Sequence, residues 1–231
     1  MSASNGISRR SFLTSAAAVT AAATLWPGTA VAAPKRPRAG KLRLVSIGSG
    51  GQGGADLAAI ASHSDVTVVA VCDVNSKTLE AQSKKYNCKG YRDYRVLFKE
   101  LAGDFDAAIV GTPDHSHALP VLLALRAGKH VYCEKPLTHN IREARAISEA
   151  WKPQRDKVAT QMGTQRAANN GKQAALKLLA DGIVGKARAV HAWSDRPTAG
   201  YAFGHGANRP LGADPVPDHL DWDLWLGGAP W

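Results

Sequence analysis

The chain has 231 residues, with 29 lysines and arginines, 19 aspartates and glutamates, and a formal charge of +10 at pH 7. Beyond the N-terminal 40 residues the basic side chains are scattered among acidic ones, without interleaved aromatics, which argues against a nucleic-acid-binding surface. Three cysteines fit no metal-binding spacing; Cys72 and Cys133 end apolar segments, so we expect buried free thiols there. The length suffices for one complete domain and part of another.

The first 33 residues have the features of an export signal. A twin-arginine sequence at 8–13 precedes an uncharged stretch rich in Ala, Thr and Ser, and small residues at 30–33 form a cleavage site. We expect a cleaved twin-arginine signal over 1–33, a flexible linker over 34–40, and export to the periplasm by the twin-arginine machinery. A membrane tether is the alternative, although Pro27 and the small polar residues make the stretch weakly apolar.

Apolar runs alternate with helical segments from residue 41 to 162. The predicted strands are 42–47, 66–72, 107–110, 130–133 and 158–161, and the predicted helices include 76–86, 118–127 and 141–152. This alternation predicts an α/β fold with right-handed βαβ crossovers. We therefore expect a doubly wound parallel sheet, a Rossmann domain, over 41–162.

The pattern changes after residue 162. A helix is predicted at about 171–181, and the alternation over 188–194 predicts a half-exposed strand of another sheet. Residues 196–231 are rich in glycine, proline and aromatics with little regular pattern, which is unusual inside a compact domain. We expect 163–231 to begin a second α/β domain with a largely antiparallel sheet, and to leave it truncated.

A glycine-rich turn follows the first predicted strand and opens a helix. Its residues are Gly48, Ser49, Gly50, Gly51, Gln52 and Gly53. In a dinucleotide-binding turn the first glycine permits the bend, the second lets the backbone approach a pyrophosphate, and the third lets helix and strand pack closely. The phosphates then lie at the helix N-terminus, where free N–H groups favour negative charge. These six residues are therefore predicted to bind a dinucleotide.

Asp73 follows the second predicted strand, about 20 residues beyond the glycine turn. A carboxylate there accepts hydrogen bonds from ribose hydroxyls and repels a 2′-phosphate, which predicts NAD as the cofactor. Lys77 leaves NADP open as the less favoured cofactor. The structural alternative is that Asp73 caps the helix that follows it.

Two further motifs follow strand ends, and with the preceding features they carry a family resemblance. One motif is Thr112-Pro113-Asp114-His115-Ser116-His117, and the other is Glu134-Lys135-Pro136. The carboxyl ends of parallel strands meet at one edge of a sheet, so both motifs are expected to face the same crevice as the glycine turn. Together with Asp73 and residues 127–131, they resemble the glucose-fructose oxidoreductase and inositol dehydrogenase (Gfo/Idh/MocA) family. Segments 161–165 and 221–227 resemble its exported members.

The resemblance implies a role for Lys135 as the catalytic residue, beside the nicotinamide and the reacting sugar carbon. An ammonium there holds a substrate hydroxyl and stabilises the alkoxide charge that develops as hydride leaves carbon. Glu134 is expected to contact the nicotinamide end or to pair with Lys135; the alternative for Lys135 is a surface lysine in a turn. Besides the glycine turn and Asp73, the implied cofactor-binding residues are Thr112, Pro113, His117, Glu134, Lys135 and Gln161.

Two other clusters are open to more than one interpretation. Asp114, His115 and His117 include a His-x-His pair that suits a metal, but no third ligand is identifiable by spacing, so we expect no metal site. Trp222 and Trp225 lie three residues apart; their faces suit a sugar, but we favour simple packing of a loop on the core.

The sequence therefore predicts an exported, NAD-dependent oxidoreductase of a CH–OH group in a sugar, cyclitol or derivative. Because no pool of free NAD is expected outside the cytoplasm, the cofactor should be exported already bound and be retained. The resemblance also implies an Asp/His pair that completes acid–base catalysis, and this chain contains no match to it. A nucleotide-binding module without full activity and an NAD-dependent glycosidase are the alternatives, and a homo-oligomer is left open.

Overall fold

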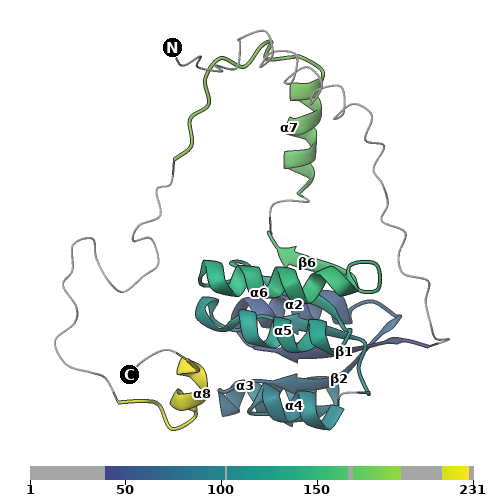
Figure 1. Cartoon of the computed structure of the whole chain (residues 1–231), viewed down its shortest axis with the longest axis vertical. Helices are drawn as coiled ribbons and strands as arrows, with labels where there is room; N and C mark the ends of the chain where they lie inside the picture. Colours follow the sequence, from purple (N-terminus) through teal and green to yellow (C-terminus); the bar gives the residue numbers. More distant parts are fainter. Residues whose placement is uncertain (1–39, 102, 166–168, 194–214, 229–231) are drawn as a thin grey trace, which may run out of the picture. The chain divides into compact units, whose positions relative to one another are not determined.

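The computed structural model of the chain describes residues 40–101, 103–165, 169–193 and 215–228. Contacts divide the chain into two compact units, residues 1–39 and 40–231. The predicted signal over 1–33, and all but the last residue of the predicted linker, lie outside the described residues. Every described residue belongs to the second unit (Figure 1).

Six parallel strands form one sheet in the second unit. They are β1 (Leu42–Ile47), β2 (Val66–Cys72), β3 (Lys89–Tyr91), β4 (Ala107–Val110), β5 (His130–Glu134) and β6 (Thr160–Gly163). Their order is β3-β2-β1-β4-β5-β6, and every neighbouring pair is parallel. The order reverses between β1 and β4, which is where a doubly wound sheet opens its ligand crevice. The predicted Rossmann fold is confirmed.

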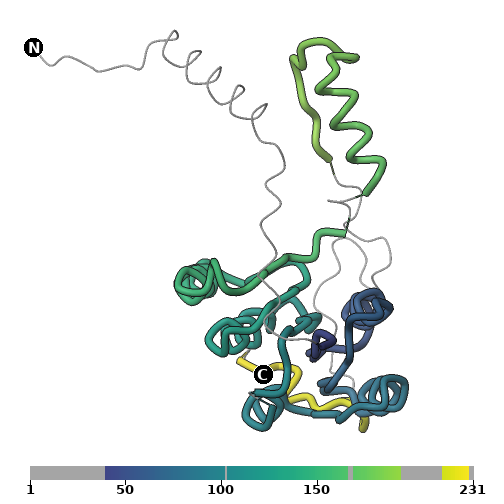
Figure 2. Tube along the Cα trace, turned by 90° about the vertical axis from the view of Figure 1, so that its right-hand side faces the viewer, coloured from purple at the N-terminus to yellow at the C-terminus, as the bar shows by residue number. Residues whose placement is uncertain are grey.

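Helices cover both faces of this sheet (Figure 2). The helices are α2 (Gly51–Ala61), α3 (Ser76–Tyr86), α4 (Tyr94–Leu101), α5 (Ala118–Arg126), α6 (Ile141–Trp151), α7 (Asn170–Ala180) and α8 (Trp222–Leu226), with 3₁₀ turns η1 (Asp114–Ser116) and η2 (Lys152–Gln154). Helices α2 and α3 lie against one face, while α4, α5 and α6 lie against the other. Across the described ranges, no helix has both the length and the apolar character needed to span a bilayer.

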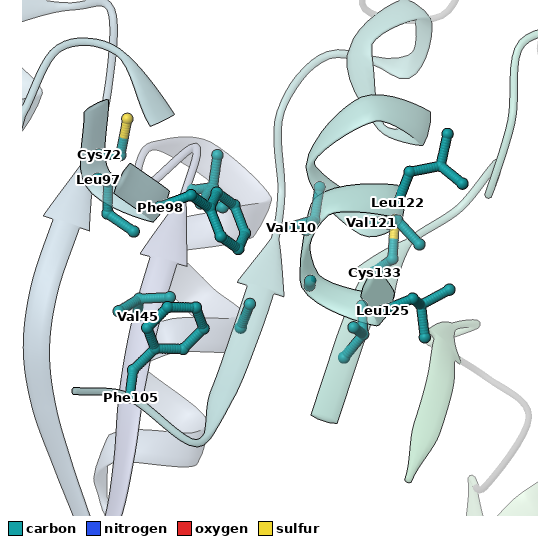
Figure 3. Packing of buried hydrophobic residues seen from close by; sticks show 14 of the residues in the cluster. Val45, Cys72, Leu97, Phe98, Phe105, Val110, Val121, Leu122, Leu125 and Cys133 are labelled. Atoms are coloured by element: carbon teal, nitrogen blue, oxygen red, sulfur yellow. The ribbon is translucent and has the colours of Figure 1, made fainter. Parts of the chain in front are cut away.

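The hydrophobic core lies on both sides of the sheet and is larger on the side of α4, α5 and α6. There Phe98 and Phe105 meet edge to face, with ring centroids 5.5 Å apart. Cys72 and Cys133 are buried free thiols, as expected, and burial raises the pKa of Cys133 to about 12. Figure 3 shows how the sheet and helices α4 and α5 contribute to this cluster, through Val45, Leu97, Val110, Val121, Leu122 and Leu125.

Three expectations about the elements were wrong or incomplete. The sequence predicted five strands, and the sixth, β3, has three residues, two of them exposed, so it shows no apolar run. The last strand of the sheet is Thr160–Gly163 rather than 158–161. Residues 188–193 form no strand: they are exposed and pair with no other strand in the described part of the chain, so alternation alone does not produce a ladder there.

Substitution of Gly53 tests how closely α2 packs against the ends of β1 and β4. A Cβ at this position would collide with the carbonyl oxygen of Gly48, although the helical backbone itself would accept alanine. We expect Gly53→Ala to lower the free energy of unfolding by about 2 kcal/mol, as overpacking of a tight interior does. Urea denaturation measures this loss. Gly103→Ala is the control, because a Cβ there meets nothing within 4 Å.

Candidate functional site

The loops that follow β1 and β4 touch through glycine backbones. Gly48 has φ +76°, and a Cβ there would lie 2.5 Å from the backbone nitrogen of Thr112. A Cβ at Gly111 would lie 2.5 Å from the Cα of Gly53. Residues larger than glycine are therefore excluded at these three positions by protein atoms alone, and the two loops form a single floor for the crevice.

Gly50 differs from these glycines, because a Cβ there is limited only by Thr78, at 3.3 Å. It is the N-cap of α2, with an extended backbone, no side-chain cap, and no acidic residue in the first turn. The first N–H groups of α2 consequently lack a capping oxygen, and helix N-termini of this kind bind anions. These N–H groups are the ones that would hold the pyrophosphate of a dinucleotide.

Asp73 lies at the carboxyl end of β2, against this turn. Its Oδ2 accepts a hydrogen bond from the backbone N–H of Ser49 at 2.9 Å, and its Oδ1 accepts one from the N–H of Asn75 at 2.9 Å. The cap of α3 is Asn75, whose side chain accepts from Lys77 and Thr78, so capping does not account for Asp73. Each carboxylate oxygen keeps a free lone pair, which a ribose hydroxyl can use.

His117 connects the loop after β4 to the turn after β5. Its ring is 1% exposed; Nδ1 lies 2.6 Å from the carbonyl oxygen of Pro136, and Nε2 lies 2.6 Å from that of Thr112. Both ring nitrogens are thus occupied by backbone groups. His117 therefore lies at the wall of the crevice and connects the two loops. Neither of its ring nitrogens is free for a ligand in this structure.

The imidazole of His115 is also engaged, because its Nε2 lies 2.8 Å from the carbonyl oxygen of Trp225. The two histidines of the His-x-His pair therefore point their nitrogens at different backbone carbonyls. Among the residues that the structure describes, no three His, Cys, Asp or Glu side chains form a group able to hold a metal ion.

The last residue of β5 and the first residue after it are a buried and an exposed charged side chain, next to each other. Glu134 is 4% exposed, and its Oε2 accepts a long hydrogen bond, 3.3 Å, from the backbone N–H of Lys135. The side chain of Lys135 is exposed, and its ammonium has no ion pair with any described residue. A lysine at the carboxyl edge of the sheet with a free ammonium is available to a ligand hydroxyl.

Gln161 is not brought to this group of residues. Its side-chain amide donates to the carbonyl oxygen of Met162 at 2.9 Å. It lines an apolar cavity of about 230 Å³ between β6, α5 and α6, together with Leu125, Ile147 and Trp151. The cofactor contact of Gln161 therefore stays a prediction, and in the structure its side chain bonds to the adjacent residue on an exposed strand.

A segment near the end of the chain, residues 219–228, forms a strap across two of these loops. Leu220 pairs with Asn75 in an antiparallel bridge, the N–H of Ser76 donates to His219 at 2.8 Å, and that of Asp221 donates to Val74 at 3.0 Å. The strap thus holds the loop that directly follows Asp73. No pattern in the sequence indicates this contact, which joins residues more than 140 positions apart.

The aromatic residues of the strap pack on each other and on the loop after β4. The rings of Trp222 and Trp225 are stacked at 4.8 Å, and the ring of His115 lies 4.9 Å from that of Trp225. Asp221 adds an ion pair with Arg92 at 2.9 Å. Between the strap and the sheet edge lies a cleft of about 690 Å³, lined by residues that include Val74, Arg92, His115, Leu119, His139 and Leu224.

Comparison with known proteins agrees with this geometry. The model of the Gfo/Idh/MocA oxidoreductase family, described as having an NAD-binding Rossmann fold, matches residues 42–162, more than half of the chain. The chain belongs to this family. A model of the twin-arginine translocation signal matches residues 6–26, so this Gfo/Idh/MocA protein also carries a signal for export by that pathway.

Its relatives include dehydrogenases and a glycosidase. Inositol 2-dehydrogenase from Salmonella paratyphi B is 32% identical over 130 residues, which cover 55% of this chain and 38% of the relative. A glycosyl hydrolase family 109 protein from Akkermansia muciniphila is 29% identical over 140 residues, which cover 52% and 29%. The crystal structure of myo-inositol 2-dehydrogenase from Lactobacillus plantarum superposes with a TM-score of 0.59 at 26% identity, covering 63% of this chain and 43% of that one. The chain spans less than half the length of these relatives.

Removal of the Asp73 carboxylate should weaken dinucleotide binding. Charge-assisted hydrogen bonds to the ribose would be lost, together with the anchor that holds Ser49 in the glycine turn, so Asp73→Ala should raise the Kd for NAD by about 10- to 100-fold. Isothermal titration calorimetry with NAD and NADP measures the change. Asp73→Asn keeps one acceptor but no charge, so its Kd for NAD should lie between those of the parent and of Asp73→Ala. It should also reduce the preference for NAD over NADP. Unchanged NAD affinity in Asp73→Ala would contradict the assignment.

Proposed function

We propose that this protein is an exported oxidoreductase that holds NAD in the crevice between β1 and β4 and oxidises a CH–OH group of a sugar, cyclitol or derivative. The observation that carries the proposal is the uncapped N-terminus of α2 at Gly50 beside the carboxylate of Asp73. An uncapped helix N-terminus suits a pyrophosphate, and a carboxylate at the end of the second strand suits a ribose. The family to which the chain belongs has the same cofactor class.

Different residues along the crevice would bind different parts of the cofactor and the substrate. The N–H groups of the first turn of α2 would hold the phosphates, and Asp73 the adenosine ribose. NAD, when bound, supplies the acceptor for hydride. Lys135 would hold the substrate hydroxyl and stabilise negative charge on its oxygen as hydride leaves the adjacent carbon. His117 holds the Lys135 turn to the Thr112 loop and so fixes the distance between these parts.

The proton released from the substrate hydroxyl needs an acceptor. The acid next to Lys135 in the described part of the chain, Glu134, is buried. We propose that residues 163–231 belong to a substrate domain and that the acceptor lies in this domain. Inositol 2-dehydrogenases among the relatives support a polyhydroxylated substrate. The periplasm is the proposed site of action, on the strength of the twin-arginine signal.

One alternative has an observation of its own. The relative from Akkermansia muciniphila is named as a glycosyl hydrolase, so a redox-neutral cleavage of a glycosidic bond by oxidation, elimination and re-reduction is the second candidate. Incubation with p-nitrophenyl glycosides separates the two functions. Release of p-nitrophenol without accumulation of NADH indicates the glycosidase, whereas NADH formation from free sugars or inositols indicates the dehydrogenase.

Exported protein purified without added nucleotide should contain nicotinamide dinucleotide at close to one equivalent per chain. Acid extraction and chromatography measure it. Lys135→Gln should keep the nucleotide but lower the rate of NADH formation by about 100-fold or more, because the charge that stabilises the alkoxide is removed. Lys157→Gln, at an exposed lysine that precedes β6 and so lies toward the opposite edge of the sheet, should match the parent. Absence of nucleotide from the exported protein would overturn the retained cofactor.

The strap offers a separate test of cofactor retention. It contacts the loops after β2 and β4, which would flank the adenosine half of the dinucleotide in the proposed function. Trp225→Ala should therefore speed NAD release, by about tenfold if one packed ring is worth roughly 1.4 kcal/mol. Stopped-flow displacement of NADH fluorescence measures the rate. Trp151→Ala, in α6 and away from the strap, is the matched control. Equal rates of NAD release from the two variants would contradict a role of the strap in retaining the cofactor.

A further inference from the structure

A glutamine side chain from α3 contacts the backbone of the glycine turn. The side-chain amide of Gln82 donates a hydrogen bond from Nε2 to the carbonyl oxygen of Ser49 at 2.9 Å. The N–H of Ser49 donates to Asp73 at 2.9 Å, and its buried hydroxyl lies 3.4 Å from the carbonyl oxygen of Cys72. Ser49 is therefore held through its N–H, its carbonyl and its side chain, by the end of β2 and by α3.

Gly54 leaves the space that the Gln82 hydrogen bond occupies. It is not one of the three glycines that the dinucleotide spacing requires. A Cβ on Gly54 would lie 2.6 Å from the carbonyl oxygen of Ser49 and 3.3 Å from Nε2 of Gln82. A larger residue at position 54 would therefore crowd both the acceptor and the donor, and the contact accounts for this additional glycine.

The Gln82 hydrogen bond fixes the direction of a neighbouring N–H. A trans peptide unit is planar, and its C=O and N–H point in opposite directions. The carbonyl of Ser49 shares its trans peptide plane with the N–H of Gly50, the N-cap of α2. Holding that carbonyl toward α3 therefore turns the N–H of Gly50 away from α3. No described residue accepts a hydrogen bond from this N–H, so it is available to a ligand.

The other atom of the Gln82 amide argues against a purely packing role. Its Oε1 is buried and meets no donor in the described part of the chain. A buried acceptor without a donor costs free energy, and a methionine of similar length would fill the same space without that cost. The amide supplies a donor to the Ser49 carbonyl, which lies outside the helical ladder because the ladder of α2 begins at the carbonyl of Gly50.

We propose that Gln82 is a positioning residue for the cofactor. By holding the Ser49 carbonyl, it fixes the peptide plane directly ahead of α2 and presents the Gly50 N–H, with the first N–H groups of α2, to the phosphates of NAD. The consequence for NAD rests on the proposed function. The hold on Ser49 is a property of the protein without ligand, and it can be measured separately.

Hydrogen exchange in protein stripped of nucleotide tests the hold on Ser49. Gln82→Met keeps the length of the side chain but lacks the donor, so the Ser49 N–H should exchange about tenfold faster than in the parent. Two-dimensional NMR of nitrogen-15-labelled protein measures this rate. Ala81→Met places the same side chain at the neighbouring exposed position and should match the parent. An unchanged rate in Gln82→Met would overturn the proposal.

Titration calorimetry with NAD tests the consequence for the cofactor. At pH 8 the Kd should rise by about tenfold in Gln82→Met, and further in Gln82→Glu, whose carboxylate cannot donate to the Ser49 carbonyl. At pH 5 the order should reverse, with Gln82→Glu binding about fivefold more tightly than Gln82→Met. The introduced carboxyl is then protonated and donates, because burial raises its pKa above the usual value of about 4.3.

This reversal separates positioning from packing, since a packing role would leave the two variants in the same order at both pH values. The other titratable groups of the turn, Asp73 among them, are common to both variants. Equal Kd values for NAD in the parent and Gln82→Met, or no reversal between pH 8 and pH 5, would refute the positioning role. If the parent itself fails to bind NAD, the proposed function fails, and the exchange rate of Ser49 alone decides whether Gln82 holds the turn.

Discussion

The close approach of glycine backbones between the loops after β1 and β4 is the constraint on which the rest of the site depends. Gly48, Gly53 and Gly111 leave no room for a side chain, so helix α2 can start directly against the sheet at the point where the strand order reverses. That placement aims the N-terminus of α2 along the carboxyl edge. Asp73, the Thr112 loop and the Glu134 turn then fall around it because parallel strands end at the same edge.

Much of this arrangement could be predicted because it is local in the sequence. The glycine spacing, the acid after β2 and the motifs after β4 and β5 each depend on one strand and the turn that follows it. Where prediction failed, the deciding contact was distant or absent: β3 is too short and exposed to show an apolar run, and 188–193 found no partner strand among the described residues. The cofactor contact of Gln161 stays a prediction; in the structure its side-chain amide donates to the carbonyl oxygen of neighbouring Met162.

The histidines and tryptophans show the same distinction at the level of single side chains. Their presence in motifs was evident, but whether a nitrogen is free depends on carbonyl groups from other loops. His117 is occupied by Thr112 and Pro136, and His115 by Trp225, a residue 110 positions later. Spacing cannot reveal such partners. The strap was missed for this reason, since it joins loops that lie far apart in the sequence.

The burial of Cys72 and Cys133 has a consequence for a protein that changes compartment. Thiols react as thiolates, and burial keeps both of these in the protonated form inside a closed core. A chain that folds in a reducing environment and then enters an oxidising one therefore keeps these two thiols unoxidised, although no disulfide protects them. Cys88 is half-buried, and burial raises its pKa as well, so all three cysteines are held back from reaction and Cys88 is the most accessible of them.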